Sequence, residues 1–531
     1  MSFQETPAPS LNKMERIKKE KNPFEVWADI ERYAETGFES IQPDDFDRFK
    51  WYGLYTQRPQ VDGYFMLRVK IPNGDLTSQQ LKVIAALSEK YGRGLADITD
   101  RQNVQYHWLR IEAISPIDKA LAEVGLSLKG SCGDTVRNII GSPLADCEQG
   151  ELIDSWAIVQ EVNAALCGKD EFSDLPRKFK ISISGSADHW VQHEINDIGL
   201  VGIKHPVTGE VGFDVWVGGG LGAQPHLGKR IKAFIRPEQV VEVCYQIATI
   251  FRDFGYRRNR KHARLKYLVA DWGAEKFRQV LEERLGYALI DNPDYEAVTD
   301  KYRDYVGVTP QKQPGLFAVG LATLRGRVNA AQLQRVAELA EQYADGHIRT
   351  TSLQNLVILN VPEANVAALR EEVRNIDLPS EEKNYFRRGA MACTGIQFCK
   401  EAVAETKDIT AEIVSYLQEQ FPDWNEPLSI NTSGCPNSCT RYQIADIGLL
   451  GSKVRQDGSD KGEKEEVYQI YLGGQLGAGM RLGHHLKRRV PVAELKTYLE
   501  GLLRRYLETR LEDENFSGFI HRHNLEELES W

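Results

Sequence analysis

Several features that would place the chain in a membrane or a secretory route are missing from its 531 residues. No run of about 18 uninterrupted apolar residues occurs, so no transmembrane helix is expected. Residues 1–27 lack an apolar core followed by small residues and contain several acidic side chains, which argues against a signal or transit peptide. We therefore expect a cytoplasmic protein with no membrane partner.

A surplus of basic residues is also missing, because 66 Lys and Arg face 76 Asp and Glu, a formal net charge of −10. Nucleic-acid binders neutralise phosphates with excess cations, so no nucleic-acid partner is expected. Any anion site must be built from a local group of cations. No glycine fingerprint is followed by a clear helix, so we expect no NADPH or flavin domain.

Cysteine is scarce, with eight residues in the whole chain. Without a signal peptide, these predict reduced thiols, metal ligands or buried apolar side chains rather than a disulfide framework. Four of them form two close pairs near the C-terminus: Cys393 and Cys399 in a C-x5-C pattern, Cys435 and Cys439 in a C-x3-C pattern. Four soft thiolates suit an iron–sulfur cluster or zinc. The C-x2-C knuckles of zinc ribbons are missing here, so a cluster is favoured, with zinc and unligated cysteines as the alternatives.

An internal duplication organises the chain. GYFMLRVKIPNG from Gly63 matches GLFAVGLATLRG from Gly315, and at the same offset of 252 TDRQN from Thr99 aligns with TSLQN from Thr351. Each copy shows an alternating strand, a turn and an amphipathic helix. A second block follows each copy: ISISGS from Ile181 resembles INTSGC from Ile430. Where the second copy has Cys435 and Cys439, the first has Ser186 and Trp190, so only one copy can bind metal through this loop.

The repeat order predicts an α+β, pseudo-two-fold fold in five segments. They are an N-terminal extension (1–57), a first ferredoxin-like half (58–128), a first larger domain without a cluster (129–309), a second ferredoxin-like half (310–380) and a second larger domain with the cysteines (381–531).

From about Phe49 to the C-terminus the sequence resembles the siroheme-dependent sulfite and nitrite reductases, in the duplication, the C-x5-C pair and the SGCPNSC loop. The resemblance implies a two-half parachute module flanked by two siroheme-type domains. It also implies that all four cysteines hold a [4Fe–4S] cluster and that Cys439 bridges the cluster to a siroheme. Asn437 in the same loop is implied to contact the cofactor.

The resemblance assigns roles to several cations and polar residues. Taken one by one, such residues usually lie on solvated surfaces. Arg68, Arg137, Lys178 and Lys180 are implied to bind the substrate anion and supply protons. Cofactor contacts are implied for Thr99, Arg101, Gln105, His107 and Arg177. Arg and Lys suit these tasks because forked donors match carboxylates and a compact ammonium can also release a proton.

The single-chain members of this family imply ferredoxin as electron donor, and we expect a monomer. An acidic ferredoxin needs a local basic face, and the candidate clusters are Arg257, Arg258, Arg260 and Lys261, or Lys487, Arg488 and Arg489. Solvated helix faces explain both clusters equally well. Tyr55 and Cys132 resemble a pair of side chains near the siroheme in some short-branch enzymes. A covalent link between these two side chains is a further hypothesis.

Sulfite is the favoured substrate and nitrite the alternative. Family nitrite reductases tend to carry Asn and Arg where this chain has Lys180 and His107. Sulfite carries more negative charge than nitrite near neutral pH, so a second lysine favours it. A rival from another class is a non-catalytic iron–sulfur binding protein, which would contain no tetrapyrrole.

Overall fold

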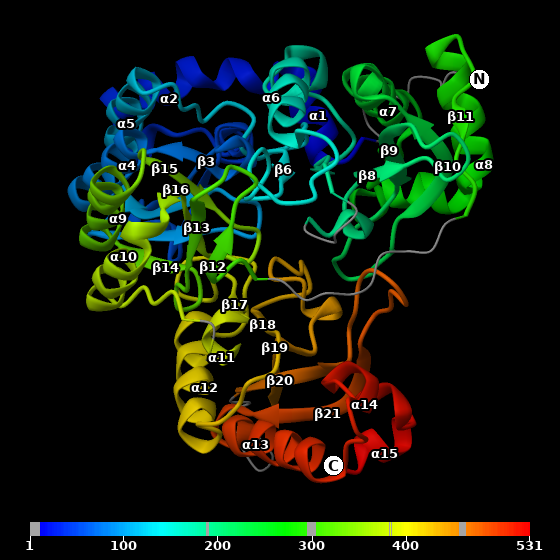
Figure 1. Ribbon diagram of the computed structural model, residues 1–531. Coiled ribbons are helices and arrows are strands. Elements are labelled where there is room, and N and C mark those ends of the chain that lie inside the picture. The colour runs from blue at the N-terminus through cyan, green and yellow to red at the C-terminus, as the bar shows by residue number, and fades with distance from the viewer. Residues whose placement is uncertain (1–10, 187–190, 295–303, 382, 384, 456–463) are drawn as a thin grey trace.

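The computed structural model describes residues 11–186, 191–294, 304–381, 383, 385–455 and 464–531. Its four sheets each belong to one of the predicted repeats (Figure 1). The longer helices are α1 (Lys13–Glu20), α2 (Val26–Thr36), α4 (Ser78–Tyr91), α5 (Ile114–Glu123), α6 (Ser155–Leu166), α7 (Val240–Phe254), α8 (Leu265–Leu285), α9 (Ala330–Tyr343), α10 (Glu363–Asn375), α12 (Lys407–Gln420), α13 (Val492–Thr509) and α14 (Phe516–Arg522). Shorter helices are α3 (Asp45–Arg48), α11 (Tyr385–Arg388) and α15 (Leu525–Glu529).

The two ferredoxin-like halves form two five-stranded sheets that exchange an edge strand. The first has the order β1 (Leu54–Thr56), β2 (Phe65–Val69), β5 (Val104–Leu109), β4 (Leu95–Ile98), β14 (Arg327–Asn329). The second has the order β12 (Gly307–Pro310), β13 (Leu316–Leu321), β16 (Leu356–Pro362), β15 (His347–Thr350), β3 (Asp75–Thr77). Strands β14 and β3 thus each pair with the other half, which ties the halves into one module.

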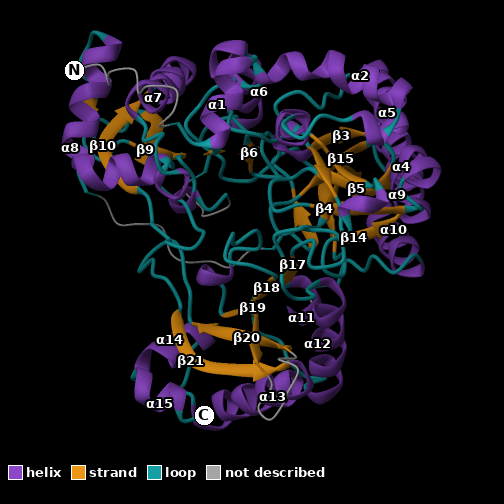
Figure 2. Ribbon diagram, turned by 180° about the vertical axis from the view of Figure 1, so that it is seen from behind, coloured by secondary structure: helices purple, strands orange, loops and turns teal. Residues whose placement is uncertain are grey.

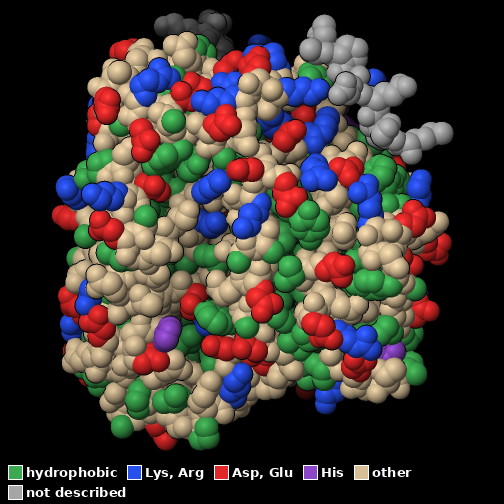
Figure 3. Space-filling view, turned by 90° about the horizontal axis from the view of Figure 1, so that it is seen from above, with side chains coloured by type: hydrophobic (Ala, Val, Ile, Leu, Met, Phe, Trp, Pro, Cys, Tyr) green, Lys and Arg blue, Asp and Glu red, His purple; other side chains and the backbone are tan. Residues whose placement is uncertain are grey.

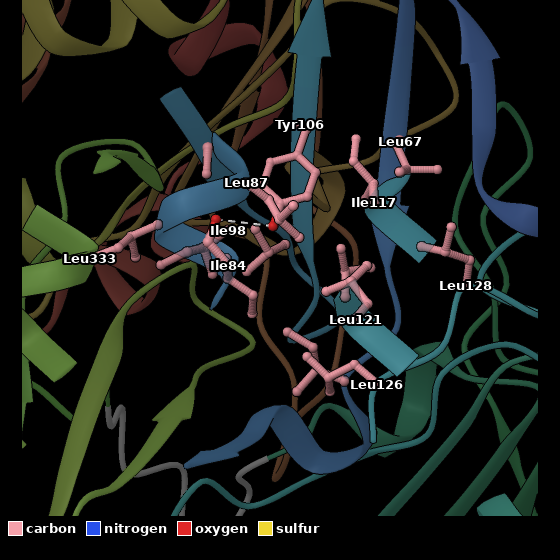
Figure 4. Packing of buried hydrophobic residues seen from close by; sticks show 14 of the residues in the cluster. Leu67, Ile84, Leu87, Ile98, Tyr106, Ile117, Leu121, Leu126, Leu128 and Leu333 are labelled. Carbon is pink, nitrogen blue, oxygen red and sulfur yellow. Dashed lines mark hydrogen bonds between the residues drawn. The ribbon is translucent and has the colours of Figure 1, made fainter. Parts of the chain in front are cut away.

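The exchanged strands lead directly into matching helices. Thr77 at the end of β3 caps α4 with Gln80, and Asn329 at the end of β14 caps α9 with Gln332, each in a reciprocal capping box. The two helices lie beside each other, with Leu333 of α9 next to Ile84 of α4 (Figure 4). Tyr106 of β5 donates from its hydroxyl to the backbone carbonyl of Ile84 at 3.1 Å. One continuous hydrophobic core therefore spans both halves.

Two further sheets form the larger domains, each with its own core. The first has the order β11 (Ile290–Asp291), β10 (Lys229–Ile235), β9 (Val211–Val217), β8 (Ile198–Lys204), β7 (Ile181–Ser184), β6 (Ile140–Gly141). The second has the order β17 (Ala390–Ala392), β18 (Ile430–Ser433), β19 (Ile447–Arg455), β20 (Lys464–Leu472), β21 (His484–Pro491). Figure 2 shows these domains on either side of a central region of loops. The predicted α+β duplication is confirmed.

The same small turn occurs in both halves and confirms the duplication at the level of single atoms. Thr99 Oγ1 accepts the backbone N–H groups of Arg101 and Asn103 at 3.2 and 3.1 Å. At the offset of 252, Thr351 Oγ1 accepts those of Leu353 and Asn355 at 3.2 and 3.1 Å.

The N-terminal extension packs onto the first half and the first larger domain. Lys18 of α1, whose side chain is buried, pairs with Glu15 at 2.5 Å and Asp174 at 3.0 Å, and lies 3.7 Å from Asp134. Among the described residues, no helix is both long and apolar enough to cross a membrane.

Candidate active site

The two cysteine pairs meet because they follow neighbouring parallel strands. Cys393 comes directly after β17, and Cys435 comes two residues after β18, which pairs with β17 in parallel register. Carboxyl ends of parallel strands lie at one edge of a sheet, so both loops leave from the same place. The backbone N–H of Cys393 donates to the carbonyl of Thr432 at 3.1 Å, which holds the loops together.

The chemistry of the four thiols fits a metal cluster. Burial raises the pKa of Cys435 to about 11, with Cys393 and Cys399 adding to the effect. Burial, together with Cys399, also raises the pKa of Cys393, whereas the Cys439 side chain is exposed. Such groups become thiolates when cations lie between them. One donor already points at Cys393 Sγ, the backbone N–H of Gly434 at 3.3 Å. The Thr406 hydroxyl donates to the backbone carbonyl of Cys393 at 2.7 Å, and its oxygen lies 3.8 Å from the Cys393 thiol, which donates to it.

The spacing of these thiols differs from that of a site for one ion. Among the described residues, no three His, Cys, Asp or Glu side chains are grouped closely enough to hold a single metal ion. In an iron–sulfur cluster each thiolate binds its own iron, so the sulfurs need not converge on one point. The four cysteines fit a [4Fe–4S] cluster better than zinc on this ground.

A cavity rich in cations lies beside the Cys435–Cys439 loop. Its lining includes Lys178 and Lys180 before β7, Arg101 after β4, and Asn437 and Arg441 of the cysteine loop. Sequence reasoning predicted the first four of these. It missed Arg441, which follows Cys439 by two residues, together with Asp100 and Arg264.

The two lysines are cations without a carboxylate partner. Within the described part of the chain, neither ammonium group has an ion pair, although Asp100 lies near enough to act on Lys180. Burial lowers the pKa of Lys180 to about 7, and burial together with Lys180 lowers the pKa of Lys178 well below its usual value. Both lysines are partly buried, and unpaired charge in such a place is unfavourable, so a polyanion would be a suitable partner for them. The arrangement fits a siroheme, whose eight carboxylates would supply the missing charge.

Arg101 lines the cavity, and most of its guanidinium is already hydrogen-bonded to neighbouring segments. Its guanidinium donates to Asn196 Oδ1 at 2.9 Å and to the carbonyl of Ile181 at 3.2 Å. Arg101 Nε is buried and meets no acceptor among the described residues, which leaves one donor for a bound group. Arg177 lies 3.4 Å from Asp134 and is therefore partly occupied by that carboxylate.

Arg68, Gln105 and Cys132 form a connected group near the cysteines. Arg68 Nε donates to Gln105 Oε1 at 3.0 Å and Nη1 donates to Cys132 Sγ at 2.6 Å. Gln105 Nε2 donates in turn to the hydroxyl of Thr394, next to Cys393, at 3.3 Å. Gln105 thereby links the Arg68 side chain to the first cysteine loop.

Tyr55 and Cys132, singled out from the sequence, are in hydrogen-bond contact. Burial favours the neutral thiol, but Arg68 and Arg137 outweigh burial and lower the pKa of Cys132. Arg137 itself donates to the carbonyl of Gly133 at 2.8 and 2.6 Å. A covalent link between Tyr55 and Cys132 stays a prediction.

His107 lies in surroundings that the sequence did not indicate. It is 1% exposed, and Nε2 lies 2.9 Å from Asp97 Oδ2. Burial lowers the pKa of His107, while Lys407 and Arg327 overcome burial to lower the pKa of Asp97. Nδ1 of His107 is buried without a partner among the described residues, so one ring nitrogen stays available to a bound group.

The ring of His107 begins a row of aromatic side chains that passes the cluster loop. It stacks on Phe398, the neighbour of Cys399, with centroids 4.1 Å apart, and Phe398 meets Trp108 edge-on at 4.5 Å. Arg93 lies over Trp108 at 5.0 Å and over Tyr64 at 5.1 Å. No sequence signal pointed to this row, because its members come from separate segments.

The metal-free copy of the loop is described only in part. Ser186 is buried, whereas Trp190, the counterpart of Cys439, lies outside the described residues.

Comparison with known proteins agrees with this architecture. A model of the nitrite and sulphite reductase 4Fe-4S domain matches residues 132–289 and 385–531. A model of the nitrite/sulfite reductase ferredoxin-like half domain matches residues 57–124 and 309–376. The exact domain boundaries predicted from the sequence remain a prediction.

Similar proteins cover nearly the whole chain. A sulfite reductase [ferredoxin] of Mycobacterium tuberculosis is 42% identical over 98% of this chain and 96% of its own length. A ferredoxin–nitrite reductase of Leptolyngbya laminosa is 39% identical over 93% of this chain and 96% of its own. The solved structure of the Mycobacterium tuberculosis NirA protein superposes with a TM-score of 0.92 at 41% identity, over 98% of this chain and 97% of that one. The chain therefore belongs to the nitrite and sulfite reductase family.

Proposed function

We propose that this enzyme reduces sulfite to sulfide with six electrons from ferredoxin, at a siroheme joined by Cys439 to a [4Fe–4S] cluster. The cluster would be held by Cys393, Cys399, Cys435 and Cys439. The alternative is reduction of nitrite to ammonia by the same cofactors. A cytoplasmic monomer is part of the same proposal.

The observation that carries the proposal is that Lys178 and Lys180, which line the cavity beside the Cys435–Cys439 loop, have no ion-pair partner among the described residues. Lys178 acts electrostatically on Cys439, as does Arg68, so the cations and the thiol share one space. A non-catalytic cluster protein has no use for such a group. The sulfite and nitrite reductases among the relatives, which are named for ferredoxin, support the same conclusion.

The siroheme, when bound, supplies an iron that can hold the substrate and pass electrons to it. The chain supplies the rest. Arg68 and Arg137 would attract and orient the oxyanion with forked donors. Lys178 and Lys180 would donate protons as oxygen leaves as water, and their lowered pKa values make that release easier. Arg101, Arg177 and Asn437 would hold the cofactor, with Thr99 and Gln105 fixing the loops that carry them.

Sulfite is preferred over nitrite because of charge. Lys180 adds a second ammonium to the pocket, and the more highly charged anion gains more from it. His107 supports sulfite through the family resemblance alone, since nitrite reductases of the family tend to carry arginine at this position.

The donor would dock on what we term the Trp108 face. It consists of the exposed cations Arg58, Arg93, Arg110 and Lys400 around the rings of Tyr64 and Trp108. Arg58 binds the cluster loop directly, through its N–H to the carbonyl of Phe398 at 3.2 Å and its guanidinium to that of Lys400 at 2.6 Å. A basic face beside a cluster ligand fits an acidic one-electron carrier.

The two basic clusters picked from sequence are weaker candidates. Arg257 pairs with Glu15 at 2.8 Å and Arg260 with Asp134 at 2.6 Å, so both belong to internal ion pairs. Lys487 and Arg488 lie on β21, at the opposite edge of the sheet from the cysteine loops. Figure 3 shows charges of both signs interspersed over the face that carries α2, α6 and α7 in Figure 1.

The function is tested by anaerobic turnover with reduced ferredoxin, measuring sulfide from sulfite and ammonia from nitrite. We expect both products, with the larger kcat/KM for sulfite. A larger kcat/KM for nitrite establishes the alternative, and absence of both activities from a protein that carries tetrapyrrole refutes the proposal.

The docking face is tested by Arg93→Glu with Arg110→Glu, matched by Lys487→Glu with Arg488→Glu. We expect the first pair to raise KM for ferredoxin at least tenfold and to flatten its salt dependence, while turnover with a small chemical reductant is unchanged. The second pair should behave as wild type. The reverse result assigns docking to β21.

A further inference from the structure

A second cavity, of about 780 Å³, lies in the cysteine-bearing domain and takes no part in the proposed reaction. It is lined by β17, β18 and the segment from Leu507 to Ser517, with a contribution from Gln192 of the other domain. Its volume is within the range of sites for small organic ligands.

This cavity is the duplicate of the cofactor pocket. The sheets define the equivalence, because Ile140 pairs with Ser182 where Met391 pairs with Asn431. Ile140 lines the cofactor pocket and Met391 the second cavity. The same relation holds for Ile195 and Ile444, at the offset of 249, and for Leu221 and Leu476, in the matching glycine loops.

Every cation of the cofactor pocket has an uncharged counterpart in the second cavity. Arg101 corresponds to Leu353, and the capping position of α8, Arg264, corresponds to the capping position of α14, Asn515. The remaining correspondences, all at the offset of 249, are Lys178 with Pro427, Lys180 with Ser429, and Arg441 with Gln192. The duplicate has therefore lost the charges that a polycarboxylate needs.

The cations that do line the second cavity already face carboxylates. Arg388 pairs with Asp304 at 2.7 Å, and Arg441 lies 3.6 Å from Asp100. Arg510 pairs with Glu426. Exposed acids, Glu512 and Asp513, stand at the mouth beside these pairs. The cavity thus disfavours an anion.

One buried polar atom in the cavity wall lacks a partner. Asn431 on β18 is 5% exposed, and its Oδ1 meets no donor among the described residues. Buried acceptors are nearly always satisfied, so a donor is missing here. Around it, Leu353, Met391 and Leu476 provide apolar surface.

We propose that this cavity is a second ligand site, which binds a compact molecule that is uncharged or cationic and donates an N–H or O–H to Asn431. The duplicate holds a larger cavity than the cofactor pocket does in this structure, and its walls differ in chemistry. It is not a second siroheme site.

Calorimetric titration of the holoenzyme tests the proposal, with thioflavin T as the cationic apolar probe and anilinonaphthalene sulfonate as the anionic one. We expect saturable binding of one thioflavin T per chain. Leu353→Trp and Met391→Trp, which fill the cavity, should each weaken it at least tenfold. Val207→Trp, at a site 78% exposed and outside the cavity, is the matched control and should change nothing.

A gain-of-binding variant tests the charge argument. Pro427→Lys with Ser429→Lys restores the lysine pair of the cofactor pocket, and should weaken thioflavin T and create a site for the anionic probe. Absence of saturable thioflavin T binding to wild type overturns the proposal. The proposal is also overturned if both tryptophan variants keep the wild-type affinity for thioflavin T. The same holds if wild type binds the anionic probe at a site that Leu353→Trp removes.

Discussion

Replacing Lys180 by Asn should move the enzyme's preference from sulfite toward nitrite. In the cavity without a bound anion, burial lowers the pKa of Lys180 from 10.5 to about 7. This difference in pKa corresponds to roughly 5 kcal/mol, which is the largest stabilisation of the charged form of Lys180 that a neighbouring anion could regain. A charged hydrogen bond contributes less, about 1.5–3 kcal/mol, or roughly ten- to a hundredfold in kcat/KM.

The assay compares kcat/KM for sulfite and nitrite in wild type, Lys180→Asn and the control Lys204→Asn, which removes an exposed lysine at the end of β8. Siroheme content is measured from absorbance in each preparation. Sulfite activity should fall most, and its decline with rising pH, as Lys180 loses its proton, should flatten in the variant. Equal loss for both substrates at full cofactor occupancy would refute the role of Lys180 in discrimination.

Three other predictions follow from the same contacts. Cys439→Ser should abolish sulfite reduction, measured as sulfide released. The control Cys244→Ser replaces a buried thiol far from the cluster in sequence and should leave most of the activity. Near-normal turnover of Cys439→Ser would contradict the bridging role. Lys18→Met should lower the free energy of unfolding by about 1.5–3 kcal/mol because it removes a buried charged contact from Glu15 and Asp134, which keep their ion pairs with Arg257 and Arg260. Lys19→Met, at an exposed site, should have little effect in the same denaturant titration. Peptide mapping of active protein should find Tyr55 and Cys132 in one cross-linked fragment if they are joined, and a free Cys132 thiol would exclude the link.

The duplication could be predicted, and the cysteine ligands could be proposed, because both are patterns along the chain. Thr99 and Thr351 repeat the same turn, and the four cysteines follow two strands whose order is visible in the repeat. The proposed roles of Lys178 and Lys180 come from family resemblance, and the structure adds that neither has an ion-pair partner among the described residues.

What the sequence could not indicate depends on contacts between distant segments. The exchange of β3 and β14 joins residues about 250 positions apart, and no local propensity encodes it. Phe398 gained a role only when folding placed His107 and Trp108 against it. The sequence shows Arg257 and Arg260 only as part of a basic cluster, which suggests a docking face. Their ion-pair partners, Glu15 and Asp134, lie far from them in the chain and become visible only in the structure.

The visible absorption spectrum of the purified protein, recorded with its iron and acid-labile sulfide content, tests the central claim most directly. We predict intense porphyrin-type bands from siroheme together with cluster absorption, and more iron than sulfide, because the siroheme adds an iron to those of the cluster. A spectrum of iron and sulfide without tetrapyrrole bands, or a colourless protein that contains zinc, would contradict it.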